Sequence, residues 1–518
     1  MSEARKAAGS FAERVHYTRG ASYLIIQILG VNVITVIAFV VLARLITVQE
    51  MGIWAILQLL VAVCSTFITW FPAAVTKFVA ENASGGSMSK ASAAFYQALR
   101  VNVVIYLPVI AGFYLGATFL ASHLLGDISY APLFQVLALD VFLSAGIIPV
   151  VTAALLGLRL FRETAVVGIV VGGVFRQLLI IILIVLTKNF VGLIIGWLIS
   201  DGVTAAIYLV VVFRALGAPR FDFPLIRLFR FYLPLELMQI VTYAQTWFDR
   251  VLLVLFAPLA MIGIYNASAT AYGVVSNVST TMNRMILPAF SSVQTRADNL
   301  KSLRAAIRLA TRYACLIVIP TDMLLLATAR PALALIAGPS YTGAGPPLII
   351  LCAADAITAF GTVLGSVFLA LEETGIVPVI FGVSAGVGVV SGYLMVPKWG
   401  IVGAAIARAA SIILIAILQV AVLKRKMNLQ LDNRNIAKTF IAGAIMAALV
   451  EGVQMINYSK FMFPFYVLIG VVIYLVMLRL LRAVDADDLD LLSRFLGKRF
   501  SMISRILSWI ILAPVHRA

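Results

Sequence analysis

Long apolar runs recur along the whole chain, and most of them exceed the roughly 20 residues that a helix needs to cross a bilayer. Of the 518 residues, 62% are hydrophobic and only 12% are charged, which is too few polar residues to cover a soluble protein of this length. Strict alternation of apolar and polar residues is absent, which argues against an outer-membrane barrel. The sequence therefore predicts an all-α integral membrane protein.

The apolar runs divide into fourteen expected spans with short connections and no inserted soluble domain. Basic residues gather in alternate connections, so the positive-inside rule predicts a multi-pass protein of the cytoplasmic membrane with both termini in the cytoplasm. These loops also account for the net charge of +17 without a nucleic-acid partner. The expected spans are 22–46, 52–72, 101–122, 131–157, 165–187, 190–214, 231–256, 262–290, 313–336, 344–371, 375–396, 400–423, 436–456 and 462–482.

An internal repeat relates the two halves of the chain. "TVQEMGIWAILQLLVAV" resembles "APLAMIGIYNASATAYG", which places Gly263 211 residues after Gly52, and the same offset separates Gly403 from Gly192. Two related six-helix lobes follow from this repeat, and even numbers of helices imply a parallel repeat about an axis along the membrane normal. In carriers with such repeats the substrate site lies between the halves.

The repeat and the loop charges together predict the domain organisation. The tail begins acidic and becomes basic and amphipathic, so we expect it to lie along the inner leaflet; a fifteenth span is the less favoured reading. The expected segments are a cytoplasmic N-terminal segment over 1–21, an N-lobe over 22–214, a cytoplasmic linker over 215–230, a C-lobe over 231–423, two additional spans over 424–482 and the amphipathic cytoplasmic tail over 483–518.

Polar residues inside two adjacent expected spans are the main candidates for a substrate path. A charge at bilayer depth is costly unless it is paired or hydrated, so each one marks a candidate functional site. The same stripes also suit hydrogen bonding from helix to helix, and the sequence leaves both readings open. The candidates are Glu236, Gln239, Tyr243, Trp247, Asp249 and Arg250 in 231–256, and Asn266, Thr270, Asn277, Thr281 and Arg284 in 262–290.

Further charges lie in other expected spans. Arg176 and Asp201 fall near the bilayer midplane and are expected to form a buried pair, while similar depths make an ion pair of Glu236 with Arg284 reasonable. Arg176, Arg284 and Arg408 are the candidates for holding a phosphate, because a guanidinium matches phosphate oxygens with two parallel hydrogen bonds. Asp140, Asp201, Asp322 and Asp355 are expected either to bind H⁺ or Na⁺ as a coupling ion or to link helices.

Catalytic and metal-binding patterns are missing from the sequence. The histidines are scattered, and the three cysteines, Cys64, Cys315 and Cys352, lie singly within apolar runs without the spacing of a disulfide frame or a metal site. We therefore expect no cofactor, no bound metal and no enzyme activity.

Several motifs resemble those of a known family. They are "LARLITVQEMGIW" after the first span, "YLPLELMQ" and "FDRVLL" in the seventh, "IGIYNAS" opening the eighth and "PKWGIVGAAIARAAS" opening the twelfth. In their order and spacing they resemble the polysaccharide-transporter branch, with its Wzx-type oligosaccharide flippases, of the multidrug/oligosaccharidyl-lipid/polysaccharide flippase superfamily. The resemblance covers essentially the whole chain.

The resemblance implies a two-lobed bundle with a water-filled cavity that opens alternately to each side of the membrane. The implied substrate is a polyprenyl-linked oligosaccharide, turned from the cytoplasmic to the outer leaflet for assembly of lipopolysaccharide or another surface glycan, with polysaccharide-assembly proteins as possible partners. A cation-coupled multidrug exporter of the same superfamily is the first alternative. A membrane polysaccharide polymerase is disfavoured, because the external loops are short and carry no metal-binding carboxylate pair.

Overall fold

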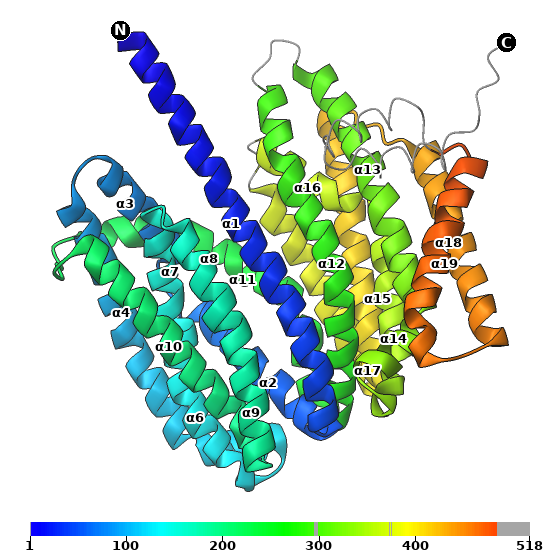
Figure 1. The fold of residues 1–518 in the computed structure, drawn as a ribbon, viewed down its shortest axis with the longest axis horizontal. Helices are drawn as coiled ribbons and strands as arrows, with labels where there is room; N and C mark the ends of the chain where they lie inside the picture. The colour runs from blue at the N-terminus through cyan, green and yellow to red at the C-terminus, as the bar shows by residue number, and fades with distance from the viewer. Residues whose placement is uncertain (1, 295–298, 372, 374, 484–518) are drawn as a thin grey trace. The chain divides into compact units, whose positions relative to one another are not determined.

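The computed structural model describes residues 2–294, 299–371, 373 and 375–483, and all regular secondary structure within these residues is helical (Figure 1). The chain divides into two compact units, Met1–Tyr243 and Ala244–Ala518, each of which is described by itself. The division falls inside a helix, beyond the expected linker 215–230, and the lobe boundaries stay a prediction. The expected amphipathic tail lies outside the described residues except for its first residue, Ala483.

The first unit contains ten helices and the beginning of an eleventh. Residues expected as a separate N-terminal segment are helical from Ser2 onward and continue directly into the first expected span. The α-helices are α1 (Ser2–Leu45), α2 (Val48–Phe67), α3 (Pro72–Ser84), α4 (Met88–Leu115), α5 (Ala117–Leu120), α6 (Ala131–Val141), α7 (Ile148–Gly157), α8 (Phe161–Ile169), α9 (Arg176–Thr187), α10 (Val191–Leu216) and, across the division, α11 (Leu225–Phe256).

The second expected span is broken where α2 ends and α3 begins. Phe71 has a φ of 76°, and Pro72 starts the new helix. The backbone groups freed by the break are satisfied by neighbours: Asn102 Oδ1 accepts from the Trp70 N–H at 2.8 Å, its Nδ2 donates to the Trp70 carbonyl at 2.7 Å, and the Tyr232 hydroxyl donates to the Thr69 carbonyl at 3.0 Å. Buried orphan backbone groups are costly, so these contacts stabilise the break.

Three short π-helical segments are described in the first unit. One, at Ala121–Leu125, follows α5, a second, at Phe142–Ile147, separates α6 from α7, and a third, at Val170–Phe175, separates α8 from α9. Such π-bulges occur frequently at functional sites. Around them α10 packs against α6, α7 and α9, and α3 packs against α4 and α7.

The second unit is built around α13, which contacts α12, α15, α16 and α18, while α19 covers α18. Its buried core joins the middle of α13 to α18 and α19 through residues such as Ile319, Met446 and Tyr466. The helices are the remainder of α11, then α12 (Leu259–Gln294), α13 (Asn299–Ala327), α14 (Ala329–Ile336), α15 (Gly345–Ile357), α16 (Gly361–Ala370), α17 (Ile376–Met427), α18 (Asn433–Ile456) and α19 (Phe463–Leu480).

Among the residues that the structure describes, ten helices are long and apolar enough to cross a membrane, or up to eleven if the bent pair Pro339–Ile357 and Gly361–Phe368 is one span. Two of the fourteen expected spans fall on α11 and α12, which are not among the ten. Two others fall on α17, whose 52 residues would reach about 78 Å, far more than a bilayer of about 30 Å. Gly400, with φ 54° and ψ −129°, interrupts α17 between those two spans. The number fourteen and the side of the termini stay predictions.

The repeated glycines have the same role in both units. A Cβ atom on Gly192 would lie 2.8 Å from the backbone carbon of Leu183, and one on Gly403 would lie 2.4 Å from the backbone oxygen of Met395. At both places the chain turns back on itself, and only glycine permits the approach. The helix ends follow the same offset, since α12 begins at Leu259, 211 residues after α2 begins at Val48.

Candidate functional site

In the first unit, Arg176 and Asp201 form the expected pair, which is thereby confirmed. Arg176 begins α9, and its Nη1 lies 3.4 Å from Oδ1 of Asp201 in the middle of α10. The guanidinium also lies over the ring of Trp197, 4.9 Å from its centroid. The Asp201 side chain is 5% exposed and that of Arg176 is 25% exposed, so the arginine keeps part of its surface open.

Asp140 brings a second carboxylate to this pair. It is fully buried near the end of α6 and interacts electrostatically with both Asp201 and Arg176. Ser144 donates a long hydrogen bond of 3.4 Å to it. Two carboxylates share one guanidinium here, and a buried charge must be neutralised by a partner, a proton or a cation. The cluster can therefore take up a proton or a small cation, or bind a substrate through Arg176.

In the second unit, Asp249 on α11 is held by Tyr265 on α12. The Tyr265 hydroxyl donates to Oδ2 of Asp249 at 2.6 Å, and the backbone N–H of Arg250 donates to Oδ1 at 2.9 Å. Both side chains are buried. The Arg250 guanidinium lies over the Trp247 ring at 4.4 Å. Asp249 is thus a bound structural carboxylate within a helix pair, while Arg250 points to a different partner.

Arg408 on α17 is the cation at the centre of this second cluster. It donates a short hydrogen bond to the Gln245 carbonyl and interacts electrostatically with Tyr265 and Asp355. Ser411, one turn further along α17, donates to Oε1 of Gln245 at 3.0 Å. Polar groups of α11, α12, α15 and α17 therefore meet around one guanidinium.

Asp355 on α15 and Asp322 on α13 extend the cluster. Asp322 is fully buried, Asp355 is 8% exposed, and the two carboxylates interact with each other. Within the described residues, neither oxygen of Asp322 has a hydrogen-bond partner. The pair again combines two buried acids with one arginine, which repeats the chemistry of Asp140, Asp201 and Arg176.

The candidates at the start of α11 do not share one exposed face. Glu236 is 6% exposed, and among the described residues neither of its oxygens has a hydrogen-bond partner of normal geometry. Gln239 is exposed, and Tyr243 is buried with its ring 5.3 Å from that of Phe67. The side chain of Arg284 lies outside the described residues, so the expected pair with Glu236 stays a prediction.

The expected polar stripe of α12 is described only at its beginning. Asn266 is 6% exposed, Thr270 is half-buried and Asn277 is exposed. The side chains of Thr281 and Arg284 lie outside the described residues. A common solvent-facing role for these five residues therefore stays a prediction.

Sequence reasoning missed Gln245, Ser411 and Trp197 as members of the two clusters. One signal for them was available, because the 211-residue offset pairs Trp54 with Tyr265 and Trp197 with Arg408. In the first unit the rings of Trp54 and Trp197 are in edge contact at 6.4 Å, and in the second unit Tyr265 interacts with Arg408. Equivalent positions thus meet in both units, with different chemistry.

Metal ligation is not indicated within the part of the chain that the structure describes, where no group of three or more histidine, cysteine or acidic residues could hold a metal ion. The three cysteines there are free and buried.

The chain is similar in sequence to a known family and to one curated protein. The family described as polysaccharide biosynthesis protein matches residues 41–346, more than half of the chain. The probable low-salt glycan biosynthesis flippase Agl15 of Haloferax volcanii is 21% identical over 210 residues, which cover 40% of this chain and 44% of that protein. The chain thus matches less than half the length of this curated relative.

Two solved structures share the fold. The lipid II flippase MurJ in an inward closed conformation has a TM-score of 0.69 at 12% identity, covering 88% of this chain and 98% of that one. An inward-facing multidrug resistance transporter of the MATE family has a TM-score of 0.62 at 14% identity, covering 79% and 98%. The chain is therefore a multi-pass membrane protein that belongs to the polysaccharide biosynthesis protein family, with a fold that the two solved membrane transporters share.

Proposed function

We propose that this transporter flips a polyprenyl-linked oligosaccharide from the cytoplasmic to the outer leaflet by alternating access. The observation that carries the proposal is a buried or half-buried arginine among carboxylates in each unit, Arg176 in the first and Arg408 in the second. A cation within a membrane span is costly and marks function by default. Guanidinium groups match the oxygens of a phosphate-linked lipid carrier.

The carboxylates beside each arginine supply a means of coupling. A phosphate that accepts hydrogen bonds from Arg176 competes with Asp201 for the guanidinium. The Asp201 carboxylate, once it loses this partner, needs another counter-charge. H⁺ or Na⁺ at Asp140 and Asp201, or at Asp322 and Asp355, would provide it. Coupling of ion binding to substrate release then follows, because ion and substrate compete for opposite members of the same cluster.

The test is flipping of a fluorescent polyprenyl-pyrophosphate oligosaccharide in proteoliposomes, measured by the fraction protected from an external quencher. Arg176→Gln and Arg408→Gln should each slow flipping about tenfold or more, since a lost charge-assisted hydrogen bond costs about 1.5–3 kcal/mol. Arg220→Gln, at an exposed loop position, is the matched control. Flipping at the wild-type rate by both variants, with the protein folded, would contradict the proposal.

Cation-coupled export of small molecules is the second candidate, and the observation that favours it is Asp322, fully buried with both oxygens lacking a hydrogen-bond partner among the described residues. Buried carboxylates suit a cationic drug or a coupling proton better than a phosphate. The same proteoliposomes decide between the two functions. Uptake of a cationic dye that Asp322→Asn abolishes, with no flipping of the lipid-linked sugar, would assign drug export instead.

A further inference from the structure

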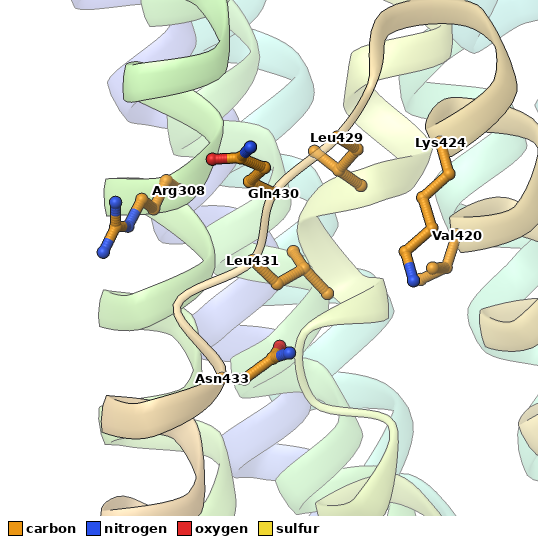
Figure 2. A pocket seen from close by; sticks show the side chains of 7 residues that line it. All are labelled: Arg308, Val420, Lys424, Leu429, Gln430, Leu431 and Asn433. Carbon is orange, nitrogen blue, oxygen red and sulfur yellow. The ribbon is translucent and has the colours of Figure 1, made fainter.

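A pocket of about 410 Å³ lies in the second unit where α17 turns into α18 (Figure 2). Arg308 of α13 and Lys424 of α17 lie on either side of the connecting segment 428–432, with Leu431 between them in the view. The residues that line the pocket are Arg308, Val420, Lys424, Leu429, Gln430, Leu431 and Asn433. None of them belongs to the polar clusters described above.

The pocket is strongly basic. The Arg308 side chain is 57% exposed and Lys424 is exposed. Within the described residues Lys424 has no carboxylate partner. Between 424 and 434 the chain carries four basic residues and a single acid, Asp432. Such a surface attracts an anion.

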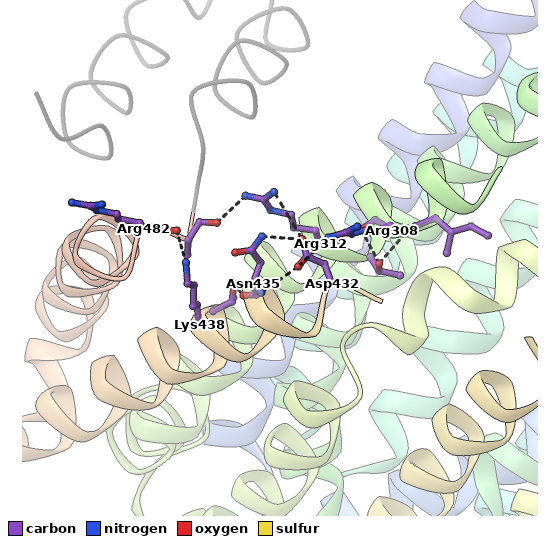
Figure 3. Close-up of polar contacts among 10 residues, drawn as sticks. Arg308, Arg312, Asp432, Asn435, Lys438 and Arg482 are labelled. Carbon is purple, nitrogen blue, oxygen red and sulfur yellow. Dashed lines mark hydrogen bonds and ion pairs between the residues drawn. The ribbon is translucent and has the colours of Figure 1, made fainter. Parts of the chain in front are cut away.

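Asp432 neutralises the pocket only in part, because it is shared among several partners (Figure 3). It caps the first turn of α18, where Nδ2 of Asn435 donates to its Oδ2 at 2.8 Å, and Nη1 of Arg312 lies 4.0 Å from the same oxygen. Arg308 approaches it only to 3.8 Å, which is longer than the 2.7–2.9 Å of a charge-assisted hydrogen bond. Arg308 therefore forms a loose ion pair with Asp432, at a distance that leaves its N–H groups able to donate to a closer acceptor.

The location and the apolar walls indicate what kind of anion fits. The pocket lies where α17 ends and α18 begins, and the apolar stretch of α13 begins at Leu303, five residues before Arg308, so its place near the ends of these helices suits a lipid phosphate. Val420, Leu429 and Leu431 give it an apolar side that a free inorganic ion would not use. Basic pockets between transmembrane helices on the cytoplasmic side are a known way to bind lipid headgroups.

We propose that this pocket binds the phosphate of an anionic phospholipid headgroup from the adjacent leaflet, with Arg308 and Lys424 as its counter-charges. The lipid is distinct from the transported substrate, and its binding does not depend on the proposed flipping activity. On the side that the loop charges predict, this leaflet is the cytoplasmic one.

The test is native mass spectrometry of the detergent-solubilised protein titrated with phosphatidylglycerol or, separately, with phosphatidylcholine. The wild-type protein should retain phosphatidylglycerol in preference to phosphatidylcholine. The double variant Arg308→Gln/Lys424→Gln should lose that preference, with an affinity for phosphatidylglycerol lower by about tenfold or more, since each basic group near a lipid surface contributes several-fold. Arg425→Gln/Arg434→Gln removes the same charge from exposed positions that do not line the pocket, and should retain the lipid.

A second variant should change the lipid affinity in the opposite direction. Asp432→Asn removes the one negative charge beside Arg308 and should raise the affinity for phosphatidylglycerol, an effect that a merely damaged protein would not show.

Competition with inorganic phosphate at millimolar concentration identifies the source of the ligand. If it displaces the lipid only from proteins with an intact pocket, the phosphate site is supported; if it binds there while phosphatidylglycerol does not, the lipid assignment is overturned. Equal lipid retention by the pocket variant and its matched control would overturn the proposal altogether.

Discussion

The buried carboxylates of this protein differ from one another in what surrounds them. Asp249 has two hydrogen bonds, one of them to Tyr265 at 2.6 Å. Asp322 has none within the described residues. Since leaving a buried acceptor without a partner costs free energy, the first carboxylate stabilises the fold, whereas the second costs stability unless a proton or a cation neutralises it.

Tyr265→Phe should destabilise the protein by about 1–3 kcal/mol, because it leaves the Asp249 carboxylate buried with one hydrogen bond fewer. The measurement is the thermal melting temperature in detergent. Tyr393→Phe, which removes the hydroxyl of a tyrosine that is 60% exposed, is the matched control and should leave the melting temperature unchanged. Equal melting temperatures for all three proteins would show that the Tyr265 hydroxyl does not stabilise Asp249.

Asp432 is expected to make stability depend on pH. Burial acts to raise the pKa of this carboxyl, but hydrogen bonds from Asn435 and the charges of Arg308 and Arg312 outweigh it, so the pKa lies below its usual value. A lowered pKa in the folded state means that the contribution is complete above the unfolded-state pKa of about 4 and is lost as the pH falls through the folded-state value.

Asp432→Asn should therefore lower the melting temperature at neutral pH by the equivalent of about 0.2–1 kcal/mol, because asparagine can still cap the helix but loses the charge that pairs with Arg308 and Arg312. The difference from the wild-type protein should shrink as the pH is lowered below about 4. Melting curves of both proteins between pH 7 and pH 3 measure it. A difference that stays constant over this range would mean that the charge of Asp432 contributes nothing to stability.

At the scale of helices, the paired glycines decide how the chain can turn. Gly192 follows the turn between α9 and α10, and Gly403 follows the interruption of α17 at Gly400. In both places a side chain would meet backbone atoms, which cannot move aside as a flexible side chain can. The close turn is thus part of the helix pair itself and not of a separable loop.

Gly192→Ala and Gly403→Ala should each lower stability by about 1–3 kcal/mol through overpacking, although alanine is the better helix former. Gly386→Ala is the control within α17, since no described atom lies within 4 Å of the Cβ that it adds, and Gly202→Ala is the control within α10, where the nearest atom lies at 3.7 Å. Neither control should lower the melting temperature. If the control variants lose as much stability as the test variants, the close approach to backbone atoms is not the cause, and these helices simply do not tolerate alanine in place of glycine.

The helices themselves were predictable from the sequence, but their interruptions were not. The apolar runs placed every expected span mainly on helical residues, because a long and hydrophobic segment in lipid must form a helix to satisfy its backbone. The break at Phe71 depends on Asn102 and Tyr232, which come from distant segments, so no local pattern marks it. The pair of Arg176 with Asp201 was predictable from depth alone, whereas Gln245 and Ser411 join Arg408 through tertiary contacts that depth does not reveal.

At the scale of the whole chain, the number of crossings decides on which side each loop lies. Single cysteines at exposed Ser129 and Asn457, placed in a variant without native cysteines, should both react with a membrane-impermeant thiol reagent from outside if fourteen spans cross the membrane. Exposed Ser89 should react only from the cytoplasmic side. Reaction of Ser129 and Asn457 from opposite sides would instead match eleven spans, with α17 crossing once.

The contact that the two repeats share has diverged in kind. In the first it joins two indole rings, Trp54 and Trp197, and in the second a phenol, Tyr265, and a guanidinium, Arg408. A homodimer assembled from the first repeat alone would carry the indole contact twice, and one assembled from the second would carry the ionisable contact twice. This chain carries one of each, so its two halves are not interchangeable.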